Sequence, residues 1–167
     1  MQLYILRHGE AGKRVPNGSK DSERPLTTTG AKEVEEIARA LVRLDIEFDF
    51  VATSPLKRAS QTTELLVKSL KLKKNAVEQW NELKPEGRRA DLYRKLSQFK
   101  QESSILAVGH EPYLSTMISE IVFGSGVARI VLKKAGLAKV TVASFRPTIK
   151  GELRWLLTPK YLKMVAK

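Results

Sequence analysis

Short apolar runs alternate with longer amphipathic stretches along most of the chain. Four of these runs, at residues 3–6, 50–53, 76–80 and 104–108, have the length and composition of buried strands. The stretches between them carry apolar residues at helical spacing. This alternation is typical of an α/β sheet whose strands are connected by crossover helices.

Capping signals predict where several helices begin. Thr27 can cap a helix that runs to about Leu44, because its apolar residues fall on one face. Ser54 is expected to cap a second helix, with Pro55 at the first helical position, where the absence of an N–H costs little. Pro112 begins a further helix.

A long polar segment at residues 10–26 has no apolar periodicity and contains two Gly, two Pro, an Asn and two Ser. Loops of this length are usually functional lids or binding segments, or are disordered. The remaining assignments are a helix over 92–99, a short helix over 127–136, a strand pair over 140–145 and 153–157 turned at 147–151, and a surface tail over 160–167.

Residues that could perform chemistry follow the ends of the predicted strands. In open α/β sheets, ligands bind beyond the carboxyl ends of the strands. We therefore expect a site at this edge of the sheet. The residues placed there are Arg7 and His8 after the first strand, Arg58 after the second, Glu82 after the third and His110 after the fourth.

The two histidines, His8 and His110, are the only ones in the chain, and each lies beside a glycine. A single histidine is most often an ordinary, partly buried side chain, but two at equivalent strand ends suggest a shared function. A metal pair fits poorly, because the local spacing of a metal site is missing and Arg7 would repel a cation. No metal or cofactor is expected.

Phosphoryl transfer fits these residues better. A neutral imidazole is a good nucleophile near neutral pH and can form a covalent intermediate, provided that a hydrogen-bond acceptor fixes the proton on its other nitrogen. The guanidinium groups of Arg7 and Arg58 match phosphate oxygens in a bidentate manner. Taken alone, however, Arg58 in so basic a chain would be interpreted as a solvated surface residue.

The overall charge indicates an anionic partner without identifying it. Thirty Lys and Arg against eighteen Asp and Glu give a formal net charge of +12, which attracts nucleic acid, anionic membranes, phosphorylated metabolites or acidic proteins alike. Cysteine is absent, which excludes thiolate chemistry and fits a reducing compartment. No apolar run approaches the roughly 18 residues of a membrane span, and no secretory signal is present, so we expect a cytoplasmic protein.

Three motifs resemble those of the histidine phosphatase superfamily, which includes the phosphoglycerate mutases. They are Arg-His-Gly-Glu-Ala at 7–11, Thr-Ser-Pro-Leu-Lys-Arg-Ala-Ser-Gln-Thr at 53–62 and Val-Gly-His-Glu-Pro at 108–112. An Arg-His-Gly triplet alone would be a weak signal. All three motifs in order, each at the end of a predicted strand, make a strong one.

The resemblance implies a fold and a set of roles. It implies a three-layer, phosphoglycerate mutase-like α/β domain over residues 1–167, with a mostly parallel central sheet flanked by helices. It implies that His8 is the phosphorylated nucleophile, and that Arg7, Arg58 and His110 bind the phosphoryl group. Gly9 joins the substrate-binding candidates through the first motif.

Within the superfamily, the chain is similar to the short bacterial phosphohistidine phosphatases of the SixA type. The segment Asp-Ser-Glu-Arg-Pro-Leu-Thr at 21–27 resembles their loop-to-helix segment. Such enzymes remove phosphate from a histidine on a phosphotransfer domain of a signalling kinase, which is the partner this resemblance implies. Phosphate or sulfate would occupy the site, whereas membranes and nucleic acid are not expected partners. Asp21 and Arg24 are expected to pair and shape the loop over the site.

Glu82 leaves two interpretations open. It follows the third strand, roughly where other superfamily members place the general acid, and a carboxylic acid in that role needs a raised pKa. Alternatively, it is a solvated loop residue beside Lys84 and Arg88. A general acid would make phosphate esters plausible substrates, whereas the labile N–P bond of phosphohistidine needs less acid assistance.

Two alternatives to a phosphohistidine phosphatase follow from the same residues. The first is a phosphatase or mutase for a small phosphoester. The second is a non-catalytic module that binds polyanions through its basic surface. Against the second, the chain has no recognisable nucleic-acid motif and only 7% aromatic residues for base stacking.

Overall fold

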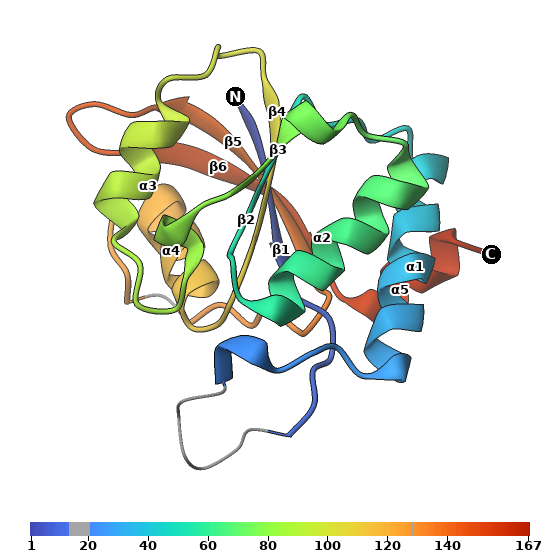
Figure 1. The fold of residues 1–167 in the computed structure, drawn as a ribbon. Coiled ribbons are helices and arrows are strands. Elements are labelled where there is room, and N and C mark those ends of the chain that lie inside the picture. Colours follow the sequence, from blue (N-terminus) through green and yellow to red (C-terminus); the bar gives the residue numbers. More distant parts are fainter. Residues whose placement is uncertain (14–20, 128) are drawn as a thin grey trace.

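The computed structural model describes residues 1–13, 21–127 and 129–167. Six strands form one sheet in the order β3-β2-β4-β1-β5-β6 (Figure 1). Strands β1 to β4 are parallel to one another, whereas β5 is antiparallel to both of its neighbours. The strands are β1 Gln2–Arg7, β2 Phe50–Thr53, β3 Val77–Gln79, β4 Ser104–Gly109, β5 Leu137–Ser144 and β6 Lys150–Leu157. The expected mostly parallel α/β sheet is confirmed.

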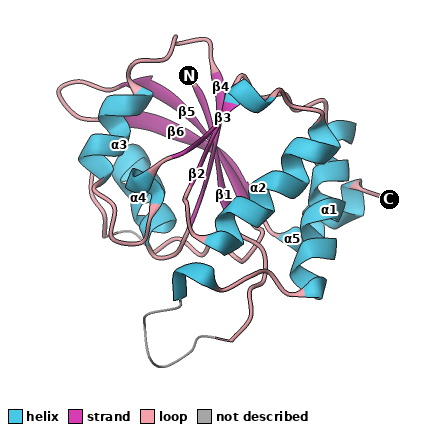
Figure 2. Cartoon of the chain, viewed as in Figure 1, coloured by secondary structure: helices cyan, strands magenta, loops and turns pink. Residues whose placement is uncertain are grey.

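Helices cover both faces of this sheet, which gives three layers (Figure 2). One face packs on α3 and α4, and the other on α1, α2 and α5. The alternation along β1 shows why: Leu3 and Ile5 belong to the first core, Tyr4 and Leu6 to the second. The helices are α1 Thr28–Arg43, α2 Lys57–Leu70, α3 Arg89–Leu96, α4 Tyr113–Phe123 and α5 Pro159–Val165, with 3-10 turns η1 Asp21–Glu23, η2 Lys74–Ala76 and η3 Asn81–Leu83.

The start of α1 agrees with its capping signal, but the start of α2 does not. Thr27 accepts a hydrogen bond from the amide of Gly30 through its side chain, as an N-cap residue should. In contrast, α2 begins at Lys57, with Leu56 as its N-cap, so the prediction that Ser54 caps the helix and Pro55 begins it is wrong. The Ser54 hydroxyl instead accepts from the amide of Leu56 within the turn before the helix.

The short helix expected over residues 127–136 is also wrong, since none of its described residues is helical. Ala135 has a left-handed backbone, with φ of 55°, and its amide donates to the carbonyls of Arg7 and His8, at 3.1 Å each. The segment therefore forms backbone hydrogen bonds with the end of β1 instead of the bonds of a helix.

The C-terminal residues are not a plain surface tail. They form α5, which packs against α1 and places Leu162 fully in the core. Lys163 also pairs with Glu33 of α1 at 2.8 Å. The predicted long loop over 10–26 lies partly outside the described residues. Its described parts contain η1 and a bridge between Ala11 and Leu26. No helix in the described part of the chain has the length and apolar character needed to cross a membrane.

Candidate active site

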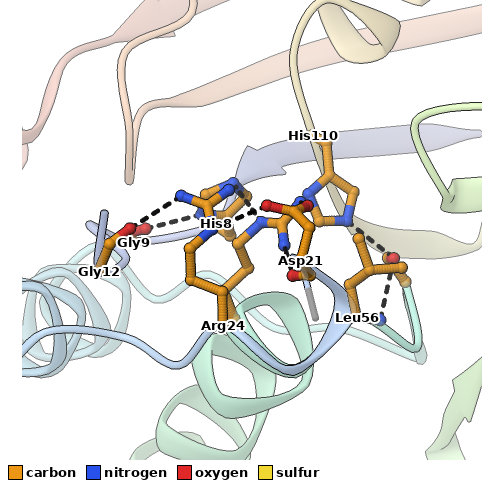
Figure 3. A network of polar contacts seen from close by, with 9 residues as sticks. His8, Gly9, Gly12, Asp21, Arg24, Leu56 and His110 are labelled. Carbon is orange, nitrogen blue, oxygen red and sulfur yellow. Dashed lines mark hydrogen bonds and ion pairs between the residues drawn. The ribbon is translucent and has the colours of Figure 1, made fainter. Parts of the chain in front are cut away.

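Three neighbouring strands end side by side, and the residues that follow them lie next to one another. Strand β4 lies between β1 and β2, with Arg7 opposite Gly109 and Thr53 opposite Val108. The next residue along each strand is therefore His8, Ser54 or His110, and all three are at least 94% buried. The rings of His8 and His110 lie 5.0 Å apart, centre to centre (Figure 3).

The hydrogen bonds of His8 fix which ring nitrogen carries its proton. Its Nδ1 lies 2.7 Å from the carbonyl oxygen of Gly9, and a carbonyl only accepts, so Nδ1 must hold the proton. The Nε of Arg58 lies 3.2 Å from Nε2, and this group only donates, so Nε2 presents its lone pair. The backbone acceptor that a nucleophilic imidazole requires is therefore present.

The surroundings of both histidines also keep them uncharged. Burial is the main cause that lowers the pKa of His8 to about 4, and the cations Arg58 and Arg7 add to it against the opposing hydrogen bond to Gly9. Burial likewise lowers the pKa of His110 to about 2, with His8 and the arginines contributing. Near neutral pH, His8 is thus a neutral base surrounded by positive charge.

Arg58 connects His8 and Asp21, two of the residues that Figure 3 labels. It lies in the first turn of α2 and is 3% exposed. Besides its bond to His8, it donates to the backbone carbonyl of Asp21 at 2.9 Å and pairs with the Asp21 carboxylate at 3.2 Å. The interpretation of Arg58 as a solvated surface residue is therefore wrong.

His110 is held from the side opposite to His8. Its Nε2 lies 2.8 Å from the Ser54 hydroxyl, which already accepts from the amide of Leu56. Within the described residues, His110 Nε2 is the acceptor available to the Ser54 proton, so the His110 proton belongs on Nδ1. This Nδ1 is buried without a hydrogen-bond partner among the described residues. An inward donor with no protein partner suits an incoming anion.

Arg7 supplies a second unsatisfied donor. One end of its guanidinium donates to the carbonyl of Leu132 at 3.0 Å. Its Nε is buried and lacks a partner among the described residues. Burial lowers the pKa of Arg7 from its usual value, and Glu111 partly offsets this. The side chain remains charged, since the ordinary pKa of arginine is above 12.

Asp21 and Arg24 pair as expected, and Asp21 reaches further into the site than the sequence suggested. Its carboxylate binds Arg24 Nε at 3.0 Å on one side and Arg58 on the other. Arg24 also donates to the carbonyl of Gly12 at 3.0 Å, which ties η1 to the segment after β1. An anionic substrate must therefore compete with the Asp21 carboxylate for Arg58.

Gly9 supports His8 and Thr62 through its backbone groups rather than offering them to a ligand. Its carbonyl accepts from His8, and its amide donates to the Thr62 hydroxyl at 3.1 Å, so neither group is free for substrate. A Cβ at this position would come within 2.8 Å of the Val34 side chain, which explains why glycine is needed. Thr62 in turn donates to the carbonyl of Arg58 at 2.7 Å and links α2 to the end of β1.

Glu82 lies in η3 beside the site, but its carboxylate is engaged elsewhere. It pairs with Lys95 of α3 at 2.9 Å. Burial alone would raise its pKa, but the hydrogen bond from Lys95 and the nearby charge outweigh burial and lower the pKa overall. A general acid needs the opposite shift, so this geometry argues for the solvated-loop interpretation.

Sequence reasoning missed Ser54, Thr62 and the carbonyl of Leu132 as supports of the site. Ser54 and Thr62 lie within the second motif, so their place next to Arg58 was a usable signal. Local helix-capping rules explained Ser54 well enough to hide its longer-range role. No sequence signal marks Leu132, because its backbone oxygen, not its side chain, holds Arg7.

We expect neither histidine to protonate between pH 8 and pH 5, whereas an ordinary histidine has a pKa near 6.5 and would protonate in this range. With two histidines in the chain, a titration followed by NMR of the ring nitrogens can resolve both. In the unfolded chain His8 binds a proton near pH 6.5, whereas in the folded chain it does so only near pH 4. The free energy of unfolding should therefore decline as pH falls through this window. A His8 midpoint near 6.5 would contradict this account of the site.

Replacing Ser54 with Ala should slow turnover roughly tenfold, the value of one lost buried hydrogen bond. His110 would lose the partner that fixes its proton on Nδ1, and this change is visible in its ring nitrogen NMR signals. Thr63→Val is the matched control, because Thr63 is buried in α2, the helix that follows Ser54, and its hydroxyl has no partner among the described residues. Equal rates for the two variants would show that Ser54 does not position His110.

The arrangement as a whole places a neutral imidazole among groups that can bind an anion. A neutral imidazole presents a lone pair, and three groups around it, Arg7, Arg58 and His110, can donate to an anion. In the described part of the chain, no three His, Asp or Glu residues gather in a way that could hold a metal ion. Fixed donors around a neutral nucleophile suit the transfer of a phosphoryl group.

Comparison with known families and proteins agrees with this geometry. A family model described as the histidine phosphatase superfamily (branch 1) matches residues 3–87. Phosphohistidine phosphatase SixA of Escherichia coli (strain K12) is 30% identical, with 98% of this chain and 98% of the relative aligned. An uncharacterized protein of Picosynechococcus is 33% identical, over 97% of this chain and 99% of the relative.

Solved structures show the same similarity in three dimensions. The structure of the protein histidine phosphatase SixA complexed with tungstate superimposes with a TM-score of 0.84 at 30% identity, covering 97% of this chain and 99% of that one. A structure described as phosphohistidine phosphatase SixA from Agrobacterium tumefaciens gives 0.74 at 23% identity, with 95% and 97% covered. The second match supports the fold alone.

Proposed function

The chain belongs to the histidine phosphatase superfamily, and we propose that it removes phosphate from a histidine of a phosphotransfer protein through a covalent phospho-His8 intermediate. The observation that carries this proposal is the state of His8: Nδ1 is locked to Gly9, Nε2 presents its lone pair, and Arg58 lies 3.2 Å away. We further propose that residues 1–167 form one histidine phosphatase domain that acts in the cytoplasm.

The first step forms one bond to phosphorus and breaks another. Nε2 of His8 attacks the phosphorus of the substrate, the N–P bond breaks, and the leaving imidazole takes a proton from solvent. Arg7, Arg58 and the Nδ1–H of His110 bind the transferring oxygens, whose charge is spread most widely in the transition state. The Nε of Arg7 and the Nδ1 of His110, which are buried and have no partner among the described residues, support these roles.

The second step returns the enzyme to its resting state. Water attacks the phosphorus, the bond to Nε2 breaks, and inorganic phosphate leaves with the proton balance completed by solvent. The hydrogen bond from Nδ1 to Gly9 stabilises the phosphorylated ring, because it disperses the positive charge that the ring gains. The similarity to SixA, a phosphohistidine phosphatase, supports this choice of substrate.

A panel of phosphorylated compounds tests the proposal. We expect hydrolysis of phosphohistidine to be much faster than hydrolysis of a sugar phosphate or a glycerate phosphate. During turnover, rapid acid-free quenching and mass spectrometry should find an acid-labile phosphate on residue 8. A faster reaction with the esters would favour the small-molecule alternative instead.

Replacing Glu82 with Gln should change the rate on phosphohistidine by less than about twofold, because the carboxylate is held deprotonated by Lys95. A residue acting as general acid typically contributes about 10²- to 10⁴-fold. The measurement is kcat on phosphohistidine and on an ester for the parent and the variant. A hundredfold loss with either compound would establish Glu82 as an acid and revive the ester alternative.

A further inference from the structure

The connection between α4 and β5 places exposed cations and exposed apolar side chains beside the site. Arg129, Lys133 and Lys134 are exposed. Val127 and Val131 are 85% and 67% exposed, which is high for valine. Single exposed apolar residues are common, but two on one connection, interleaved with cations, are typical of a contact surface.

Hydrogen bonds fasten this connection to the catalytic strand end. Leu132 is buried and its carbonyl holds the guanidinium of Arg7 at 3.0 Å, while Ala135 bonds to the carbonyls of Arg7 and His8. The connection thus runs along the same end of the sheet as η1 and the start of α2 (Figure 1). Its outward side chains form part of the rim around the site.

Along this connection, side chains that pack into the core alternate with side chains that face solvent. Ile130 and Leu132 turn toward the core, so the side chains on either side of them, Arg129, Val131 and Lys133, point outward. Neither Arg129 nor Lys133 makes a side-chain ion pair among the described residues, whereas Lys134 lies 3.8 Å from Glu10. Their charges are therefore available to a partner.

We propose that Arg129, Val131 and Lys133 form a docking surface for an acidic, folded protein whose phosphohistidine enters the site. This inference rests on the proposed function. A small phosphate compound fills only the space among Arg7, Arg58 and His110. A protein that inserts a phosphohistidine must also cover the rim. Cations at a rim speed association with an acidic partner, and a central apolar contact slows dissociation.

Nucleic acid fits this surface less well. The stretch 129–134 is Arg-Ile-Val-Leu-Lys-Lys and contains no aromatic residue. Proteins that bind single strands without sequence preference combine basic grooves with aromatic side chains on which the bases stack. An exposed valine between the cations favours a protein surface instead.

A charge-reversal pair with a matched control tests the docking surface. The test variant is Arg129→Glu/Lys133→Glu, with Val131→Ser as a separate change. The control is Lys73→Glu/Lys74→Glu, which reverses two exposed lysines just before β3. These lysines lie at the amino end of the parallel strands, whereas the site lies at the carboxyl end. Both pairs change the net charge equally. The probes are an acidic histidine phosphotransfer domain, phosphorylated with phosphoramidate, and free phosphohistidine.

We expect kcat/KM for the phosphorylated domain to fall about tenfold at low salt in the test variant and much less in the control, as rim charges act on association. Val131→Ser should weaken binding of the domain at all salt concentrations. Rates on free phosphohistidine should stay within about twofold of the parent. Equal losses in test and control would overturn the proposal, since they would show only a long-range effect of net charge. Displacement of the domain by duplex DNA would also overturn it.

Binding separates this proposal from the proposed function. Affinity of the phosphorylated domain for a His8→Asn protein, with and without the Arg129/Lys133 changes, reports docking even if no turnover occurs. If the parent protein hydrolyses neither probe, the proposed function fails, and the affinities still decide the surface. If the parent hydrolyses both probes and the affinities are unchanged by the test variant, the docking surface alone fails.

Discussion

Replacing His8 with Ala should reduce turnover by at least about 10⁴-fold, the scale of loss when a covalent nucleophile is removed. The His8 imidazole is a neutral group beside the cations of the site, and its Nε2 carries a lone pair at the point where Arg58 donates. The variant should still bind phosphate, because Arg7, Arg58 and His110 remain. Steady-state rates and a titration with inorganic phosphate measure the two effects separately.

Two controls complete this experiment. Thermal unfolding should show that the variant is folded. This control is needed because His8 is buried and bonded to Gly9. The chelator EDTA should leave the parent rate unchanged, because the arginines are proposed to balance the charge of the transferring group and His110 to donate a hydrogen bond to it. Most of the parent rate surviving in His8→Ala, on any phosphorylated substrate, would refute the mechanism.

Replacing Arg58 with Ala should lower kcat by about 10²- to 10³-fold, the cost of removing one preorganised donor from a transition state. Arg58→Lys should recover only part of this loss, since an ammonium cannot reach His8 and a phosphate oxygen with the same planar geometry. Lys57→Ala is the matched control. Lys57 is the preceding residue, and its pairing with Glu23 is long, at 4.0 Å, and exposed.

The measured quantities for Arg58 are kcat, KM and the inhibition constant of inorganic phosphate. Arg58 also holds Asp21 in place, so the variant should loosen η1 and make it more accessible to proteases. A loss in kcat smaller than about fivefold would lie well below the effect expected of a transition-state donor. It would mean that Arg58 only positions Asp21.

Strands β1, β2 and β4 could be predicted from sequence because each is a short apolar run, and each is largely buried. The Thr27 cap was predictable for the same reason, since donor and acceptor lie three residues apart. Placing His8, Arg58 and His110 at one edge needed only the rule that parallel strands share a carboxyl end. Such features depend on local sequence and on one general property of sheets.

The errors involve hydrogen bonds between distant parts of the chain. Ser54 looks like a helix cap, but its hydroxyl bonds a ring 56 residues away. The 127–136 segment has helix-forming residues, yet its backbone forms hydrogen bonds with the end of β1. The tail after residue 158 forms a helix because Leu162 finds a place against α1. Tertiary partners of this kind override local preference and leave no local trace.

The position of β4 has a consequence for how the protein acquires activity during synthesis. This strand is the fourth in the chain but lies between the first two in the sheet. A ribosome must therefore translate through residue 110 before any nascent chain can close the gap between β1 and β2. Until then His8, the proposed nucleophile, has no opposing imidazole, so emerging chains should be inactive, and a premature stop before β4 should yield no residual enzyme.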